Sequence, residues 1–267
     1  MDFGNVIIMT DLDGTLLTDD KKILEKDMAA INRFRSGGGL FTVATGRSYA
    51  MAKRAGEELG LDIPAVLFNG AAVFDFKTDK FLWQCEINPK TYDYVRIIGE
   101  QFPKIGAEVL CDQSVIVPYL NDTEQMHLDW EQVDAEFCDV SDLPKSGWLK
   151  FLFADEPHKL DVVEQFVKNG DFSGVHWIRS APHFLECLPE NVDKSRGFSE
   201  LIKILGVEER FTVAAGDYMN DIAMIQKAQL GIAVGSAHES VKTAADLIVC
   251  DNNSGAISEV IDYIERL

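Results

Sequence analysis

The sequence predicts an α/β protein in which a parallel-sheet domain is interrupted by an α+β insert. Two observations favour this fold class. Short apolar runs rich in β-branched residues alternate with segments of helical spacing in both end regions of the 267-residue chain. Between residues 87 and 189 the pattern changes to pairs of short strands beside helices, which is typical of a separate α+β unit. The two end regions must then combine into one sheet.

The first end region, residues 1–86, alternates strands and helices. Val6–Thr10 is an apolar run typical of a strand that is buried on both faces. Residues 23–35 carry apolar side chains at helical spacing, and the glycines at 37–39 end this helix. The elements that follow are predicted as strand 40–44, helix Tyr49–Leu59, and strands 63–68, 72–76 and Lys80–Gln84.

The insert is predicted to fold by itself around an aromatic core. Three of the four tryptophans lie in it, and we expect them to be buried there. Four of the five histidines also lie in it, but no two have the spacing of a zinc-binding pair, so a zinc site is not expected. The predicted elements are helix 89–102, a hairpin of strands 108–111 and 114–117, helix 123–130, strand 148–153, helix 158–168, and strands 175–179 and 184–188.

The second end region returns to the α/β alternation from Lys194 onward. Its strands are again short apolar runs, and its helices again have one apolar face. They are predicted as helix 197–205, strand 211–215, helix 222–228, strand 230–234, helix 238–243, strand 247–250 and helix 256–266.

Charge and composition exclude some classes of partner. The formal net charge of −19 argues against nucleic acid and anionic membranes, because both require a basic surface. No apolar run is long enough to span a bilayer, and residues 1–5 lack the basic start of a signal peptide. The five scattered cysteines form no CxxC pair, which indicates reduced thiols in a cytoplasmic protein. A small molecule is the expected partner.

Two aspartates directly follow the first predicted strand. Asp11 and Asp13 would point the same way if the extended backbone continued, and Gly14 allows the chain to turn sharply there. The carboxyl ends of parallel strands are where open α/β sheets bind ligands. An isolated Asp-x-Asp-Gly segment is also a common acidic turn, so this pair alone does not establish a site.

Candidate ligand-binding residues also follow two further strands. Thr45 and Gly46 end a strand at a helix start, where a hydroxyl and backbone N–H groups can hold an anion, although Thr45 taken alone is more often a helix cap. Asp217 and Asp221 follow Gly216 and lie one helical turn apart, so both can face one point. Acidic residues are common at the start of a helix, which explains one of these aspartates. This explanation accounts less well for two aspartates that directly follow an apolar strand.

Four segments together resemble the motifs of the haloacid dehalogenase-like hydrolases, and most closely those of its Cof-type branch of sugar-phosphate phosphatases. They are DLDGT at 11–15, Thr45 in ATGR, Lys194 in NVDKS, and GDYMND at 216–221. The branch carries its cap between the second and third motifs, where the insert lies here. The resemblance implies a Rossmann-like core of residues 1–86 and 190–267 and a substrate-specificity cap of residues 87–189. Ser195 and Ser236 replace the Gly and Asn that are usual in the branch.

The resemblance also implies roles for the four aspartates. Asp11 is expected to be the nucleophile, and Asp13 to protonate the leaving alcohol and then accept a proton from water. Mg²⁺ is the expected cofactor, because several close carboxylates cannot all ionise without a cation and oxygen ligands favour it. Asp11 and Asp217 would bind it through side chains and Asp13 through its main-chain carbonyl, with Asp221 behind them or binding through water.

Further residues are expected around the phosphate and the substrate. Thr45, Gly46 and Lys194 would hold phosphoryl oxygens, although Lys194 by its position alone would be an exposed lysine at a helix start. Substrate contacts are expected from Arg47, Asn69 and Asn220.

The predicted function is a Mg²⁺-dependent phosphatase that hydrolyses small phosphate monoesters, sugar phosphates in particular, through an aspartyl-phosphate intermediate. Two alternatives remain open: a phosphomutase of the same superfamily, and a catalytically inactive regulator that binds sugar phosphates. The intact set of motif residues argues against the regulator. A monomer or weak homo-oligomer is expected.

Overall fold

The structure, a computed structural model, describes residues 2–267 and divides into two compact units. The first comprises the chain up to Thr45, Arg54–Trp83 and Asp193–Leu267. The second comprises Gly46–Lys53 and Gln84–Val192. Most of the two end regions of the sequence therefore folds as one unit, and the middle of the chain folds as another.

The first unit is built on a five-stranded parallel sheet in the order β14-β13-β12-β1-β2. All five residues of the interior strand β1 (Val6–Thr10) are buried, because β2 (Leu40–Val43) and β12 (Phe211–Gly216) flank it and helices cover the sheet. The remaining strands are β13 (Leu230–Ala233) and β14 (Leu247–Ile248). Since β1 pairs with β12, the prediction that both end regions build one sheet is confirmed.

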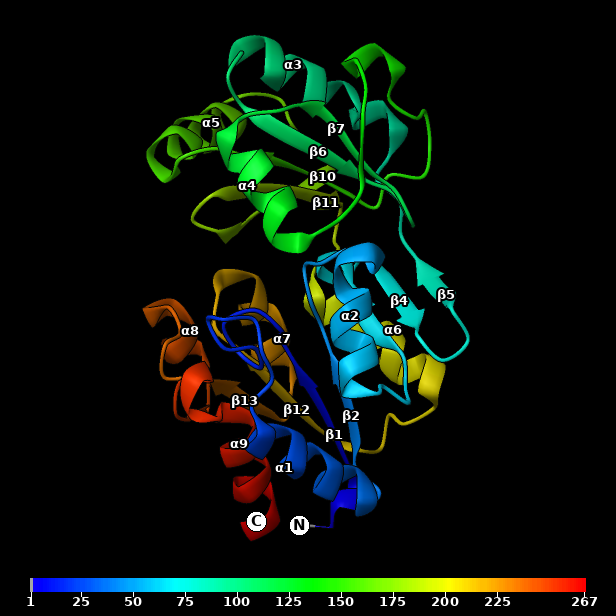
Figure 1. Cartoon of the computed structure of the whole chain (residues 1–267), viewed down its shortest axis with the longest axis vertical. Coiled ribbons are helices and arrows are strands. Elements are labelled where there is room, and N and C mark those ends of the chain that lie inside the picture. Colours follow the sequence, from blue (N-terminus) through cyan, green and yellow to red (C-terminus); the bar gives the residue numbers. More distant parts are fainter. Residues whose placement is uncertain (1) are drawn as a thin grey trace. The chain divides into compact units, whose positions relative to one another are not determined.

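The last helix of this unit illustrates why the helices pack as they do. α9 (Ala256–Arg266) buries Ile257, Ile261 and Ile264 along one face, at the spacing of successive helical turns. This face lies against α1 (Glu25–Ser36), and the two helices run side by side (Figure 1). The other helices with residues in this unit are α2 (Tyr49–Leu59), which continues into the second unit, α6 (Lys194–Leu205), α7 (Ile222–Lys227) and α8 (Glu239–Ala244).

A three-stranded sheet completes the first unit. It contains β3 (Ala65–Leu67), β4 (Ala72–Asp75) and β5 (Lys80–Gln84). The predicted strand 63–68 is shorter in the structure and pairs antiparallel with β4, and an isolated bridge between Ala44 and Val66 joins it to the main sheet. The chain leaves β3 through a tight turn in which Asn69 has a φ of 52°.

The second unit is a six-stranded sheet in the order β10-β11-β9-β6-β7-β8 with helices beside it. Its elements are α3 (Asp93–Gln101), β6 (Gly106–Leu110), β7 (Val115–Tyr119), α4 (Asp122–Glu131), β8 (Ala135–Phe137), β9 (Lys150–Ala154), α5 (Pro157–Asn169), β10 (Val175–Ala181) and β11 (Phe184–Pro189). The short edge strand β8 was not predicted, because its three residues are not buried and give no apolar run. Every helix in residues 2–267 is too short or too polar to span a lipid bilayer.

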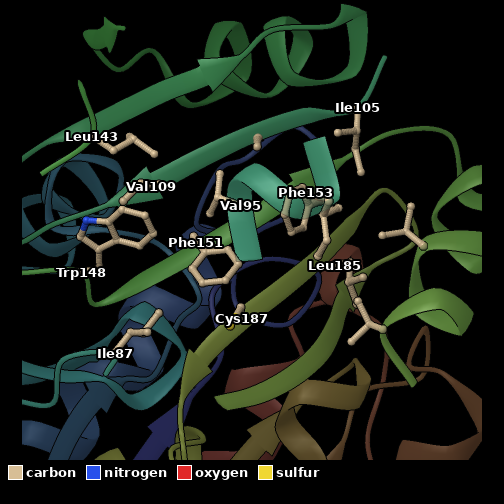
Figure 2. Packing of buried hydrophobic residues seen from close by; sticks show 14 of the residues in the cluster. Ile87, Val95, Ile105, Val109, Leu143, Trp148, Phe151, Phe153, Leu185 and Cys187 are labelled. Atoms are coloured by element: carbon tan, nitrogen blue, oxygen red, sulfur yellow. The ribbon is translucent and has the colours of Figure 1, made fainter. Parts of the chain in front are cut away.

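The second unit has its own aromatic core. Trp148, Phe151 and Phe153 are at most 1% exposed and pack with aliphatic side chains from α3, β6 and β11 (Figure 2). The ring of Tyr92 stacks on that of Trp148 with centroids 3.8 Å apart. The expectation that the tryptophans are core residues fails for Trp130, which is 65% exposed because the buried face of α4 passes through Leu128 and not two residues further.

Candidate active site

The parallel register brings three candidate residues to one edge of the main sheet. Asp11 follows β1 directly, and its backbone N–H donates to the carbonyl of Ala215 in β12, at 2.9 Å. Asp217 therefore begins the loop next to Asp11. On the other side of β1, Ala44 N–H donates to the carbonyl of Thr10 at 2.9 Å, so Thr45 leaves the sheet at the same edge.

Lys194 joins two of the aspartates. Its Nζ lies 2.7 Å from Oδ1 of Asp11 and 2.6 Å from Oδ1 of Asp221, and its side chain is completely buried. The other oxygen of Asp221 accepts backbone N–H groups from Asp217 at 3.0 Å and Tyr218 at 3.2 Å. Asp221 thus fixes both the lysine ammonium and the loop that carries Asp217.

Two glycines permit this close arrangement. Gly14 has a φ of +76°, and a Cβ built on it would lie 2.5 Å from Oδ2 of Asp217. Gly70 has a φ of +103°, and a Cβ there would lie 1.9 Å from the carbonyl oxygen of Asp193, the N-cap residue of α6. Because α6 begins at Lys194, the bare backbone at Gly70 allows this lysine to reach the cluster.

The electrostatics of the cluster favour a bound cation. Burial raises the pKa of Asp11 well above its ordinary value against the opposing effect of Lys194, and Asp221 and Asp217 raise it further. Burial and the Asp221 charge raise the pKa of Asp217 to about 7. Burial alone would lower the pKa of Lys194, but Asp11 and Asp221 raise it above its ordinary value, so the ammonium stays charged.

The donor set fits a hard divalent cation. Carboxylate oxygens of Asp11, Asp217 and Asp221 lie within 4.8 Å of one another and share one ammonium. All-oxygen ligands of this kind suit Mg²⁺ better than softer ions. Lys194 and two backbone N–H groups reach both oxygens of Asp221, whereas Lys194 holds Oδ1 of Asp11 and Thr15 holds Oδ1 of Asp217.

Asp13 is placed differently from the other three aspartates. The chain turns after Asp11, so the extended backbone that would align the two side chains does not continue. The Asp13 side chain is 34% exposed and its Oδ1 lies 2.5 Å from Nζ of Lys21. Its carboxylate is therefore accessible to solvent and does not belong to the buried group of Asp11, Asp217 and Asp221.

The two candidate asparagines meet each other. Nδ2 of Asn220 donates to Oδ1 of Asn69 at 3.0 Å, and both residues are at least nine-tenths buried. This bond joins the turn after β3 to the turn after β12. Contact of either residue with substrate remains a prediction.

Gly46 and Arg47 belong to the second unit. The Gly46 carbonyl accepts a hydrogen bond from Nζ of Lys150 at 2.7 Å. Nη1 of Arg47 lies 2.9 Å from Oε2 of Glu131 and donates to the Met51 carbonyl at 3.1 Å. Their predicted contacts with phosphate and substrate remain predictions.

One contact of the cluster was not foreseen from the sequence. The hydroxyl of Thr15, which is 1% exposed, donates to Oδ1 of Asp217 at 2.9 Å. Thr15 lies in the DLDGT segment, but its partner is 202 residues away in the chain, so no local pattern could pair them. The bond orients the Asp217 carboxylate and lowers its pKa against the effect of burial.

Comparison with known proteins agrees with this geometry. A family model described as haloacid dehalogenase-like hydrolase matches residues 8–261. The pyridoxal phosphate phosphatase YbhA of Escherichia coli is 26% identical over 270 residues, covering 96% of this chain and 97% of its own. The 5-amino-6-(5-phospho-D-ribitylamino)uracil phosphatase YcsE of Bacillus subtilis is 25% identical over 259 residues, covering 96% and 94%.

A solved structure shows the same fold. The subclass IIB sugar phosphatase BT4131 of the same superfamily superposes with a TM-score of 0.84 at 20% identity, covering 98% of this chain and 99% of its own. The match of the family model over nearly the whole chain, with relatives that are phosphatases by name, agrees with the resemblance drawn from the four sequence motifs. The chain therefore belongs to the haloacid dehalogenase-like hydrolases, in the Cof-type branch, and is a phosphatase.

Proposed function

We propose that this phosphatase is Mg²⁺-dependent and hydrolyses small phosphate monoesters, sugar phosphates in particular, through a phosphoryl group carried on Asp11. The observation that carries the proposal is the buried cluster in which Lys194 joins Asp11 to Asp221 beside Asp217. Relatives whose names specify small phosphorylated compounds support the substrate class.

Asp11 is the nucleophile in this proposal. Lys194 holds one of its oxygens at 2.7 Å, which fixes the carboxylate and leaves the second oxygen for attack on phosphorus. The same ammonium offsets negative charge as the phosphoryl group approaches. Thr45, at the same sheet edge, supplies a hydroxyl and a backbone at the start of the next loop for a phosphoryl oxygen.

The metal site is assigned to Asp11, Asp13 and Asp217. Asp11 and Asp217 would hold Mg²⁺ through their side chains and Asp13 through its main-chain carbonyl. Bound there, Mg²⁺ would neutralise charge on the carboxylates and on the phosphate. Asp221 has both oxygens committed to protein donors, so it is a positioning residue for Lys194 and for the Asp217 loop.

Asp13 moves the protons. In the first step an Asp11 oxygen forms a bond to phosphorus, the bond from phosphorus to the ester oxygen breaks, and Asp13 protonates the departing alkoxide. In the second step water attacks phosphorus, gives its proton to Asp13, and the Asp11–phosphorus bond breaks to release phosphate. The exposure of the Asp13 carboxylate, 34%, is consistent with a group that must meet both an alcohol and water.

The second unit is the proposed substrate-selecting domain. We assign this role to residues 87–189, which form most of the second unit, because the residues given the phosphoryl-transfer steps here, Asp11, Asp13 and Lys194, lie in the first unit. The assignment rests on the family to which the chain belongs and predicts that exchanging this segment with that of a relative exchanges substrate preference.

A phosphate-release screen tests the proposal. Purified full-length protein is assayed over a panel of sugar phosphates and nitrophenyl phosphate, with Mg²⁺ and with chelator. We expect release that requires Mg²⁺ and falls to background in Asp11→Asn. Transfer of the phosphoryl group to a second position of the sugar without phosphate release would contradict hydrolysis, and undiminished release in chelator would contradict the metal assignment.

A further inference from the structure

The second unit contains a buried group of metal-ligating side chains that the proposed function does not use. Glu108 lies on β6, and Glu124 and His127 lie on α4, which packs against β6. Glu124 and His127 are three residues apart and therefore share one face of the helix. One ligand atom of each of these three residues lies within 4.8 Å of the other two.

The fold holds α4 close to β6 at this point. A Cβ on Gly106 would lie 2.5 Å from Oδ1 of Asn121 and 2.7 Å from Cβ of Glu124, so only glycine admits this approach. Oδ1 of Asn121 accepts the backbone N–H of Glu124 at 2.8 Å and caps the helix. Its Nδ2 donates to the Ala154 carbonyl of β9 at 2.8 Å. Glu124 is thus set in place by the backbone around it.

The two glutamates are buried without donors. Glu108 and Glu124 are both 0% exposed, and no donor group in residues 2–267 makes a hydrogen bond to any of their four carboxylate oxygens. Buried carboxylates in proteins are paired, hydrogen-bonded or bound to a metal. The two glutamates therefore need a partner from outside the chain.

The charges around the group define what is missing. Glu186, also buried, lies 3.0 Å from Nζ of Lys150, whose ammonium also attracts Glu108 and Glu124. The ammonium of Lys150 is therefore shared among three carboxylates. A proton shared by Glu108 and Glu124 would offset one negative charge, and a divalent cation would offset two.

The position of the imidazole favours the cation. Nδ1 of His127 lies 3.8 Å from Oε1 of Glu108, too far for a hydrogen bond. Two ligands of one ion with bond lengths of about 2.0–2.2 Å can be up to about 4 Å apart. Two carboxylates with an imidazole suit transition-metal ions such as Zn²⁺, Mn²⁺ or Co²⁺, in contrast to the oxygen-only donors of the first unit.

We propose that Glu108, Glu124 and His127 bind a divalent transition-metal ion that ties α4 to β6. This site is separate from the Mg²⁺ site proposed around Asp11 and Asp217, and it stands whether or not that proposal holds. The ion would stabilise the second unit, because it links α4 to β6. Without it, the charges of Glu124 on α4 and Glu108 on β6 repel each other.

Metal binding to the full-length chain tests the proposal. Protein stripped with chelator is dialysed against micromolar Co²⁺ with millimolar Mg²⁺ present to fill the oxygen-only site. We expect one Co²⁺ per chain, visible d–d absorption bands, and a melting temperature raised by Co²⁺. Glu108→Gln, Glu124→Gln and His127→Gln should each weaken Co²⁺ binding by at least about 10- to 100-fold, the loss that is usual when a residue supporting a metal ligand is changed.

Two control variants decide where the ion sits. Asp129→Asn removes an exposed carboxylate from the same helix and should keep full Co²⁺ binding. Asp217→Asn disrupts the oxygen-only site of the first unit and should also keep full Co²⁺ binding. In chelator the two Glu→Gln variants should melt no lower than the unsubstituted protein, since each removes a repelling charge. If one of them fails to fold, His127→Gln still carries the test.

Three results would overturn the proposal. Co²⁺ binding that is no tighter in the unsubstituted protein than in Glu124→Gln would show that no site exists there. Binding lost in Asp217→Asn but kept in Glu124→Gln would place the ion in the first unit. A protonated carboxyl band in the infrared spectrum at neutral pH, absent in Glu124→Gln and unchanged by Co²⁺, would show that Glu108 and Glu124 share a proton.

Discussion

The Nζ atom of Lys194 lies 2.7 Å from Oδ1 of Asp11, and the two side chains are 0% and 9% exposed. With Asp221 at 2.6 Å on its other side, the ammonium of this lysine is shared by two buried carboxylates of the first unit. Replacement of Lys194 should therefore lower stability as well as activity.

Replacing Lys194 by Met should destabilise the protein at neutral pH by about 3–5 kcal/mol, the usual cost of removing one partner of a buried ion pair. The difference should shrink as pH falls, because protonation of Asp11, whose pKa is raised well above its ordinary value, removes uncompensated charge. Urea unfolding in chelator at neutral and acidic pH measures it. Lys203→Met, an exposed lysine on the same helix paired with Glu200 at 3.3 Å, should change stability by less than about 1 kcal/mol. An equal loss at both pH values would contradict the account.

Stability in the absence of metal should fall as pH rises from about 4 to about 7. The folded protein holds the Asp217 proton up to a pKa of about 7, whereas an unfolded aspartate loses it near about 3.9. In this window the folded state binds more protons, so raising pH favours unfolding.

Urea unfolding across this pH range, with chelator and with Mg²⁺, checks that slope. We expect Mg²⁺ to flatten it, because the cation stabilises ionised Asp217, and Asp217→Asn to reduce it without metal. Glu208→Gln, which removes an exposed carboxylate from the same unit, should leave the slope unchanged. A slope that is identical in Asp217→Asn would assign the pH dependence to another group.

The hydroxyl of Thr15 should set the affinity for Mg²⁺. Thr15→Val keeps the shape of the side chain but removes the donor to Asp217, so the carboxylate loses its orientation. We expect the Mg²⁺ concentration for half-maximal activity to rise about 10- to 100-fold. Thr212→Val, which removes a threonine hydroxyl from the other end of β12, should not change it. Equal Mg²⁺ requirements in both variants would rule out this role for Thr15.

Local patterns predicted the elements of the main sheet well. β1 and α2 have the bounds expected from apolar spacing and β-branched content, and the sheet joins both end regions as predicted. The patterns failed where long-range packing decides. β8 is too short and exposed to leave a signal, and Trp130 is exposed because the helical face on which it lies has no partner within its unit.

The candidate site was predictable in its residue types but not in its contacts. The order of carboxylates after apolar strands pointed to the sheet edge where Asp11 and Asp217 lie. The pairing of Lys194 with Asp221 depends on where α6 starts relative to β12, which the sequence does not encode locally. In the second unit, the sequence did not indicate the group of Glu108, Glu124 and His127, because it contains only one histidine and Glu108 comes from another element.

Asp13→Asn should slow the enzyme without abolishing it. The variant keeps the nucleophile but lacks the proton donor, so hydrolysis of sugar phosphates should fall by roughly 10²- to 10⁴-fold. Phosphorylation of the enzyme by nitrophenyl phosphate should fall much less, because nitrophenolate leaves without a proton. Rapid-quench rates of the first half-reaction with both substrates measure the difference. The same loss on both would mean that Asp13 is not the general acid.

The central claim is that the phosphoryl group passes through Asp11. Rapid acid quench of the enzyme during turnover of a labelled phosphate ester, followed by peptide mapping, measures this directly. The account predicts a phosphoryl group on the peptide that carries Asp11, formed faster than phosphate release, and none in Asp11→Asn. Turnover without label on that peptide, together with substantial activity in Asp11→Asn, would contradict it.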